Sequence, residues 1–539
     1  MKKYLLTLAS GLLVMSSFAQ IKLSEGPGLN NDEDNKMNRM IEGEDGAFYS
    51  YRIRTRGKGT SYIIEKFDRT KLTTLFSKEV EIPTDRTKVL DVEFAGGKVF
   101  VIYRTYDKDK EIMSVYFKTV SPLGQVSGAA TELFNRKTDH YEFIDFDIST
   151  NQSKSKFAVR TTYKANKEDT YKTDFILYDA SAQKTIWTKT VNKYLKKSNP
   201  WFVWSFRSTE TTGLLGFMLN DNDDIYYAFN EKLKKDDKKD DRYNATVEIL
   251  KADSKSPIAT KLDLNAEYVI YDASFCMSNN TIMLAGFFKD VIERKGRDLV
   301  DVGVFNYKLN NTTGAIEGKA VKTFDAKILT AIESSPKKAR GMNYKVDYIL
   351  ASGDAFYLVG EQYIVTVQDR NQGMLGDIVG LASGANPFYI GKNFIYEYMD
   401  VIVAKINGKG EFEWVSNSPL RNGTTTIDNP HVFKQYIAYV SSKGLYLFYN
   451  EHRKNEERLL KPDYEPRDLK TQVTIHGSNF VYSKITPDGK VKHAKICENE
   501  TYCFAPIQER DLHFLPPEDA EIYVNGKPDE IIIYQEDHG

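Results

Sequence analysis

Histidine and cysteine, the side chains that most often bind metals or act as nucleophiles, are scarce in this sequence. Seven histidines and three cysteines occur among its 539 residues, and no two histidines stand at the spacing of a zinc site. The sequence also lacks HExxH, GxSxG, P-loop and strand-to-helix GxGxxG motifs. We therefore expect no metal site, no cofactor and no catalytic residue, and we predict that the protein is not an enzyme.

An excess of positive charge is missing as well. The chain has 74 Lys and Arg residues against 75 Asp and Glu residues, which gives a formal net charge of −1. Proteins that bind nucleic acid normally carry a basic surface, so this balance argues against that class. The mixed run from Lys232 to Arg242 is expected to be a solvated hairpin extension.

Calcium-binding loops of the EF-hand type are also absent. The stretch "NDNDDIYY" begins at Asn220 and offers oxygen ligands at alternate positions. Its sixth residue is Ile225, where such a loop needs glycine. We expect a polar turn there.

Long apolar runs are absent except at the N-terminus, "MKKYLLTLASGLLVMSSFAQ". Two lysines precede a short apolar run, and a small-x-small site ends at Ala19, so residues 1–19 are predicted to be a signal peptide. No other apolar stretch reaches about 18 residues, and we expect no transmembrane helix. The mature protein is therefore predicted to be extracytoplasmic: periplasmic, associated with the outer membrane, or secreted.

The three cysteines are compatible with that compartment. Cys497 and Cys503 flank the short turn "CENETYC", and an oxidising compartment permits a disulfide between them. The sequence alone leaves open whether they are bridged or free. Cys276 is expected to be a buried small hydrophobe.

Helical periodicity is scarce, and one β-hairpin recurs instead. Each copy has an alternating strand, a turn rich in Asn, Asp, Gly or Pro, and a second strand, which is typical of tight hairpins. The copies are "SYIIEKFDRTKLTTLFSKEV", "SVYFKTVSPLGQVSGAATEL", "DFILYDASAQKTIWTKTV", "VGVFNYKLNNTTGAIEGKAVKTF", "DVIVAKINGKGEFEWVSNSP" and "FVYSKITPDGKVKHAKIC".

A strongly apolar strand and, before it, a weaker strand precede these hairpins. The apolar strands are "GKVFVIYRTYD", "SKFAVRTTYK", "TGLLGFMLND", "NTIMLAGFFKD", "DAFYLVGEQY" and "KGLYLFYNEH". The repeating unit thus has four strands, and about seven units begin near Ala47, Val89, Phe143, Val203, Val269, Tyr348 and Val432. Repetition of a four-stranded unit predicts a β-propeller.

We predict an all-β fold: a propeller of about seven four-stranded blades over residues 47–539, preceded by an N-terminal segment, 20–46. The first unit lacks a clear first strand, so we expect N- and C-terminal strands to pair and close the ring. Two smaller β-domains are the alternative architecture.

Two long connections interrupt the repeat, at about 368–393 and 450–472. Both join the second and third strands of adjacent units, so they would emerge side by side on one face. Insertions of this kind on a rigid scaffold are common binding sites. The candidate partner-binding residues are Met374, Leu375, Ile378, Val379, Leu381, Phe388, Tyr389, Arg453 and Arg458. The apolar part could instead fold as a short helix over the blade edge.

The segments "DVIVAKINGKGEFEW", "AFYLVGEQY" and "LYLFYNEH" resemble secreted β-propeller-like proteins of Gram-negative bacteria over most of the mature chain. The resemblance implies fold and compartment, and it supplies no catalytic residues to transfer.

Our first hypothesis for function is a non-enzymatic scaffold whose protein partners belong to the cell envelope or outer membrane. The alternative is a glycan-binding or carbohydrate-active propeller, in which Asp145, Asp147 and Asp272 on inner strands would face the central channel. That chemistry needs two carboxylates at a defined separation. An extracellular structural or adhesive module is a third reading.

Overall fold

The computed structural model describes residues 35–537 with gaps. The longest gaps are 139–144, 165–170, 198–211, 233–242, 326–339, 370–391, 456–468, 471–477 and 511–522. The predicted signal peptide lies outside the described residues. Within them, no helix is long and apolar enough to cross a membrane.

Seven antiparallel sheets follow one another along the chain, and consecutive strands form each sheet. Blade 1 contains β1 (Asn35–Glu42), β2 (Phe48–Arg56), β3 (Gly59–Phe67) and β4 (Thr74–Val80). Blade 2 contains β5 (Thr87–Ala95), β6 (Lys98–Asp107), β7 (Ile112–Val120) and β8 (Thr131–Lys137). Blade 3 contains β9 (Asp145–Thr150), β10 (Lys156–Lys164), β11 (Tyr171–Asp179) and β12 (Lys184–Val191).

Blade 4 contains β14 (Thr212–Leu219), β15 (Ile225–Lys232), β16 (Tyr243–Leu250) and β17 (Ile258–Leu262), and the short β13 (Lys196–Lys197) lies parallel to β14. Blade 5 contains β18 (Tyr268–Ser278), β19 (Thr281–Lys295), β20 (Asp298–Asn310) and β21 (Ile316–Thr323). Blade 6 contains β22 (Arg340–Ser352), β23 (Ala355–Asp369), β24 (Lys392–Ile406), β25 (Phe412–Ser418) and β26 (Asn422–Ile427). Blade 7 contains β28 (Tyr436–Ser441), β29 (Gly444–His452), β30 (Ser478–Ile485) and β31 (Val491–Glu498).

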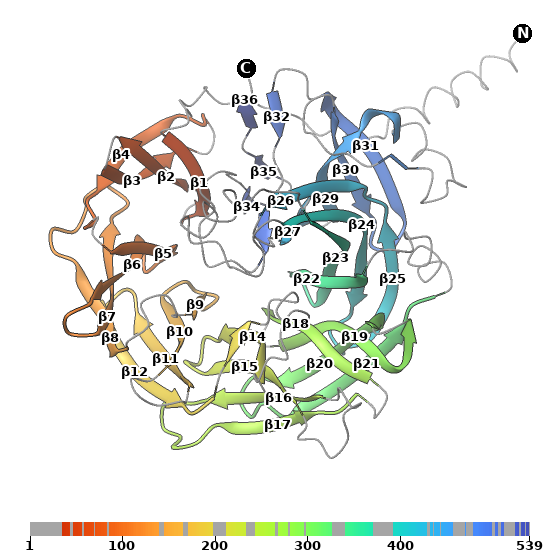
Figure 1. The fold of residues 1–539 in the computed structure, drawn as a ribbon, viewed down its shortest axis with the longest axis horizontal. Coiled ribbons are helices and arrows are strands. Elements are labelled where there is room, and N and C mark those ends of the chain that lie inside the picture. The colour runs from red at the N-terminus through yellow and green to blue at the C-terminus, as the bar shows by residue number, and fades with distance from the viewer. Residues whose placement is uncertain are drawn as a thin grey trace, which may run out of the picture.

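The sheets stand in a ring, and the first strands of blades 1 to 6 lie on its inner side (Figure 1). This arrangement confirms the all-β prediction and the seven-bladed propeller. The six recurring hairpins are the third and fourth strands of blades 1, 2, 3, 5, 6 and 7. The alternative of two smaller β-domains is wrong, because one ring contains all seven sheets.

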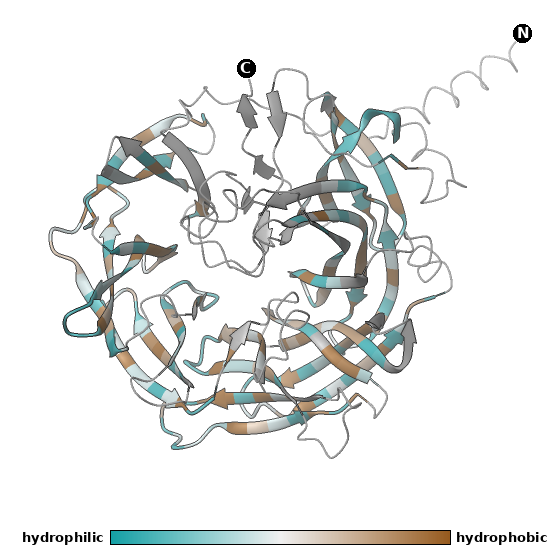
Figure 2. Cartoon of the chain, in the orientation of Figure 1, coloured by the Kyte–Doolittle hydropathy of each residue, from teal (hydrophilic) through white to brown (hydrophobic). Residues whose placement is uncertain are grey.

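Apolar side chains between neighbouring blades form the core. Each boundary from blades 1 and 2 to blades 6 and 7 has its own buried cluster, to which both blades contribute. Figure 2 shows hydrophobic residues concentrated on the strands of the ring. Because each middle strand packs on both faces, its sequence reads as a nearly continuous apolar run rather than as an alternation.

Hydrogen bonds from strand side chains to turns also join adjacent blades. Asn306 Nδ2 of blade 5 donates to the carbonyl O of Gly410 in blade 6 at 2.9 Å. Trp414 Nε1 of blade 6 donates to the carbonyl O of Pro487 in blade 7 at 2.9 Å. These turns connect the third and fourth strands, so they brace the face opposite the long insertions.

Closure of the ring differs from the prediction. Blade 1 is completed by β1, which lies inside the segment 20–46 that we expected to precede the propeller, and not by a C-terminal strand. The polar sequence "NKMNRMIE" hides this strand, because its few apolar residues do not alternate with polar ones. The C-terminal strands β32 (Tyr502–Phe504), β34 (Tyr523–Lys527), β35 (Glu530–Ile533) and β36 (Gln535–Asp537) lie between blades 7 and 1 (Figure 1).

The predicted starts of the units are right in some blades and wrong in others. Val89, Val269 and Tyr348 lie in the first strands of blades 2, 5 and 6, whereas Phe143 and Val203 lie outside the described residues. The segment "TGLLGFML" is the first strand of blade 4, not the second. Val432 belongs to the separate strand β27 (Val432–Lys434), which pairs with β33 (Gln508–Arg510).

Candidate functional site: the base of the insertions in blades 6 and 7

The sheet of blade 6 continues past the body of the blade and carries the first insertion. β23 and β24 stay paired as far as Asp369 and Lys392, so the insertion spans 370–391 rather than 368–393. On the edge away from β23, β24 pairs first with β26, as far as Tyr398 opposite Asn422, and then with β25. We call β26, the paired first half of β24 and the end of β23 the stalk.

A buried ion pair fixes the junction between blade and stalk. Arg421 lies in the break between β25 and β26, and its Nη1 donates to Asp400 Oδ1 at 2.6 Å. Asp400 lies where β24 changes partner, and its Oδ2 accepts a hydrogen bond from Asn417 Nδ2 at 2.8 Å. The Arg421 and Asp400 side chains are only 8% and 2% exposed. The pair therefore ties the outer strand to β24 where regular pairing is interrupted.

The second insertion leaves blade 7 through a short turn, η2 (Arg453–Asn455), at the end of β29. Asn455 is fully buried, and its side-chain amide makes two hydrogen bonds with the backbone of Lys470, each of 2.7 Å. Glu451 Oε1 accepts a hydrogen bond from Asn455 Nδ2 at 2.6 Å. We call Glu451, Asn455 and Lys470 the neck, because they join the two ends of this insertion.

Burial dominates the electrostatics of the neck. It raises the pKa of Glu451 to about 7, against the smaller opposing effects of its hydrogen bonds and of the nearby Arg421 guanidinium. A carboxyl with this pKa can exchange a proton near neutral pH.

The structure places only part of the predicted partner-binding set. Arg453 lies exposed in η2, beside the neck. The other members lie outside the described residues: Met374, Leu375, Ile378, Val379, Leu381, Phe388, Tyr389 and Arg458. Both insertions do connect second and third strands of adjacent blades, as expected, and so they leave the same face.

Sequence reasoning missed the residues that support the insertions. The segment "KGLYLFYNEH" predicts a strand and gives Glu451 no special role, and no motif points to Asp400 or Arg421. The sequence does offer one sign of the buried ion pair: Asp400 stands directly before the apolar run Val401–Ala404. Charged residues are rarely buried unless they are paired. The partner of Asp400 could not be found, because the pairing depends on the break between β25 and β26.

The inner-strand carboxylates considered for glycan chemistry are engaged in the fold. Asp147 on β9 forms an ion pair with Arg160 on β10. Asp272 on β18 accepts a hydrogen bond from the backbone N of Val346, in the first strand of the next blade, at 2.6 Å. Asp145 lies on β9, and its side chain is outside the described residues. The two described carboxylates thus link strands or blades.

No protein-family model matches this sequence, and no curated protein matches it. Among solved structures, the chain is similar to an acylaminoacyl peptidase of Pyrococcus horikoshii, at 10% identity over 79% of this chain and 60% of that one, with a TM-score of 0.33. It is similar to the polysaccharide lyase Uly1 at 9% identity, over 80% and 90% of the two chains, with a TM-score of 0.38.

A third similarity is to an α-L-arabinanase of Penicillium chrysogenum complexed with arabinobiose, at 7% identity over 56% of this chain and 97% of that one, with a TM-score of 0.28. This chain spans less than two thirds of the length of the acylaminoacyl peptidase. Similarities this weak say nothing of what the chain binds or does, and the propeller assignment rests on its own sheets.

Blade 7 contains a serine–histidine contact that is structural. Ser483 Oγ lies 2.8 Å from His493 Nδ1, and Tyr449 Oη lies 2.9 Å from Ser483 Oγ. Ser483 is fully buried, so a substrate cannot reach its hydroxyl in this arrangement. Burial lowers the pKa of His493 to about 4, which keeps the imidazole neutral at neutral pH.

The stretch "NDNDD" forms a braced turn, in agreement with the expected polar turn. Asn220 Oδ1 accepts hydrogen bonds from the backbone N of Asn222 and of Asp224, at 3.0 and 2.8 Å. Its Nδ2 donates to Asn311 Oδ1 of blade 5 at 2.7 Å. Among the described residues, no group of three or more His, Cys, Asp or Glu side chains could hold a metal ion.

The cysteine predictions have separate outcomes. Cys276 on β18 is a free, partly buried thiol, and burial raises its pKa to about 12. Cys497 lies on β31 and Cys503 on β32, but their side chains are outside the described residues. The disulfide stays a prediction.

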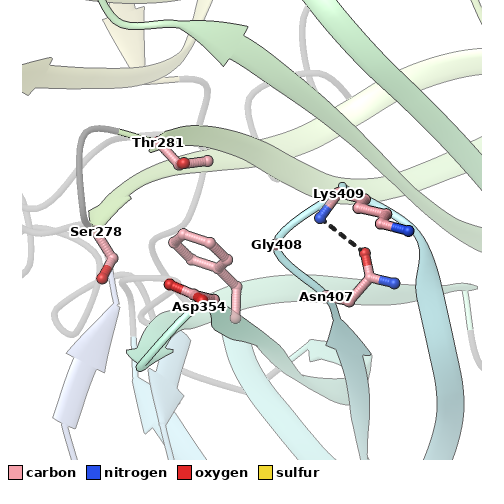
Figure 3. Close-up of a pocket in the computed structure, with 7 residues that line it drawn as sticks. Ser278, Thr281, Asp354, Asn407, Gly408 and Lys409 are labelled. Atoms are coloured by element: carbon pink, nitrogen blue, oxygen red, sulfur yellow. Dashed lines mark hydrogen bonds between the residues drawn. The ribbon is translucent and has the colours of Figure 1, made fainter.

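A groove of about 390 Å³ lies between blades 5 and 6, on the face opposite the insertions. Figure 3 shows its polar rim, where the side chain of Asn407 accepts a hydrogen bond from the backbone N of Lys409. Ser278 Oγ donates to the carbonyl O of Gly353 at 3.2 Å, across the two blades. These contacts make the groove a seam between blades.

Proposed function

We propose that the protein is a non-enzymatic propeller that scaffolds a protein complex of the cell envelope or outer membrane, outside the cytoplasm. The partner contacts the face that carries the insertions of blades 6 and 7. The predicted signal peptide supports the compartment.

The observation that carries the proposal is the base beneath the insertions. A stalk of paired strands holds residues 370–391, and the buried Arg421–Asp400 pair fixes the stalk to blade 6. A sequence with apolar residues such as Met374 and Phe388, flanked by the charged segment of blade 7, has the composition of a contact surface with an apolar centre and a polar rim. A rigid base limits the entropy lost when such a surface binds.

Deletion of residues Gly373 to Pro387 tests the proposal. The cut lies wholly inside the insertion, so the stalk strands β23 and β24 keep their register and the variant should fold. We expect the wild type to recover envelope proteins in a pull-down from native membranes, and the deletion variant to lose them.

Leu123→Asp is the matched control. Leu123 lies in the turn between β7 and β8, on the opposite face, and is 83% exposed. Its substitution removes an exposed apolar side chain without touching the insertions, so the recovered proteins should be unchanged. A folded deletion variant that recovers every partner of the wild type would refute the proposed contact face.

A further inference from the structure

In the part of the chain that the structure describes, the Asn455 side chain closes the neck of the blade 7 insertion. Asn455 Nδ2 donates to the carbonyl O of Lys470, and Asn455 Oδ1 accepts from the backbone N of Lys470. These two hydrogen bonds resemble those between paired residues of a β-sheet. They link Asn455, where the chain leaves the blade, to Lys470, near the point where the chain returns to it. Asn455 has no exposed surface, so water does not compete for these bonds while the neck is closed.

Glu451 sets the orientation of that amide. Its Oε1 accepts hydrogen bonds from Asn455 Nδ2 at 2.6 Å and from the backbone N of His452 at 2.7 Å. Its Oε2 is buried and has no hydrogen-bond partner in the part of the chain that the structure describes. Glu451 is 1% exposed. A buried carboxylate with one oxygen unsatisfied is costly to keep charged.

The charges around Glu451 give little compensation. Arg421 of blade 6 acts on it electrostatically, but the Arg421 guanidinium is shared with Asp400. Within blade 7, the nearest basic residues along the chain are Arg453, Lys454 and Lys470, and their side chains are exposed to solvent.

Strand β30 pairs with β29 at this position, and it places a neutral residue, Asn479, opposite Glu451. His452, the next residue on β29, contributes a backbone hydrogen bond, and its ring Nδ1 accepts from the backbone N of Lys454. The neck therefore holds a carboxyl that is better accommodated with a proton than without one.

We propose that Glu451 is a proton-linked positioning residue: with a proton it leaves the Asn455–Lys470 lock closed, and without one it favours opening of the neck, which hydrates the carboxylate. This inference deepens the proposed function. Its effect on partner binding rests on that function, because the neck would then control how the blade 7 insertion is presented to a partner.

The direction follows from proton linkage. The pKa of Glu451 is about 7 in the closed neck and about 4.3 when the side chain is hydrated. The stabilisation of the closed neck by this proton is complete below the lower value, and it is lost as pH rises through the higher one. The opening equilibrium should increase by about tenfold for each pH unit within that window.

Hydrogen exchange of the full-length protein tests the proposal without any partner. We expect the Lys470 amide, corrected for intrinsic exchange, to lose at least about tenfold of its protection between pH 5.5 and pH 8. Glu451→Gln keeps an acceptor oxygen but cannot ionise, so its protection should not change with pH. Glu413→Gln, at a 40%-exposed side chain on blade 6, is the matched control and should follow the wild type.

A second variant tests whether the protection of the Lys470 amide depends on the Asn455 hydrogen bonds. Asn455→Ala removes the lock and should leave the Lys470 amide poorly protected at both pH values. Wild-type protection that is constant across the window, or a Glu451→Gln variant that keeps the wild-type pH dependence, would overturn the proposal. Since no partner is present, failure of the pull-down experiment and failure of this one are distinguishable.

Discussion

At the scale of single residues, charged and polar side chains buried between strands hold this propeller together at its irregular points. Arg421 and Asp400 stand at the break of the outer strand, and His493 is packed against Ser483 and Tyr449 in the sheet of blade 7. Each group depends on partners that the unfolded chain does not provide. Their contributions should therefore appear in the free energy of unfolding and in its pH dependence.

Removing one member of the buried ion pair should be strongly destabilising. We expect Arg421→Ala to lower the free energy of unfolding by about 3–5 kcal/mol, because Asp400 is left as a buried charge without its cation. Lys490→Ala, which breaks the exposed pair with Asp488, should leave the melting temperature unchanged. Chemical denaturation of both variants measures the difference, and similar stabilities would contradict the role given to the pair.

His493 should make the fold sensitive to mild acid. Its pKa is lowered to about 4 in the fold, while an unfolded histidine titrates near 6.5. The unfolded state thus binds the extra proton first, and stability present above about pH 6.5 is lost as pH falls towards 4, by up to about 3 kcal/mol. His493→Asn should flatten this part of a stability–pH curve measured by denaturation, and an unchanged slope would contradict the assignment.

At the scale of elements, the first strands of blades 5 and 6 share a bulge that faces a glycine. The pairing register shifts between Ile270 and Asp272 in β18, and an added Cβ on Gly286 in β19 would lie 2.0 Å from the carbonyl O of Asp272. In blade 6, an added Cβ on Gly360 would lie 2.3 Å from the carbonyl O of Lys345. The glycines of "LAGFF" and "LVGEQ" therefore permit close approach of the two strands.

Alanine at either glycine should disturb its blade. We expect Gly286→Ala and Gly360→Ala each to cost about 1–3 kcal/mol, because backbone atoms must move to admit the methyl group. Gly128→Ala meets no atom within 4 Å and is the control. Thermal unfolding should rank the two strand variants below the control, and equal melting temperatures would contradict the packing account.

Turn residues in the sequence predicted the hairpins correctly, but the sequence predicted the position of a strand within its blade less well. Turn residues such as Asn407 and Gly410 carry their own hydrogen bonds, so the hairpin can be inferred from nearby sequence. "TGLLGFML" was misplaced because an apolar strand has the same pattern in the first and second positions of a blade. The neck and the stalk junction join residues that only the register brings together.

At the scale of the whole molecule, the ring has one sector unlike the others. Blades 1 to 7 are each built on four antiparallel strands, with β13 and β26 added in blades 4 and 6, and they share apolar clusters along the ring. Short C-terminal strand pairs lie between blades 7 and 1 (Figure 1). β33 pairs with β27 ahead of blade 7, and β34 lies beside β1. The C-terminal strands thus connect the two ends of the ring.

Removing these strands should weaken closure. Residues such as Phe448 and Phe480 form a buried cluster within blade 7, away from the cluster shared with blade 6. We expect a chain that ends at Glu498 to melt at a lower temperature than the full chain and to bind more of a dye specific for apolar surfaces. An unchanged melting temperature would show that the C-terminal strands do not close the ring.

Site-specific photo-crosslinking in intact cells shows most directly whether partners bind the face that carries the insertions. A photoreactive residue at Gln368 would lie exposed at the end of the stalk, and one at Lys409 would lie exposed on the opposite face of blade 6. We expect a covalent adduct with an envelope protein from position 368 and none from position 409. Adducts from position 409 alone would show that the partner binds the opposite face.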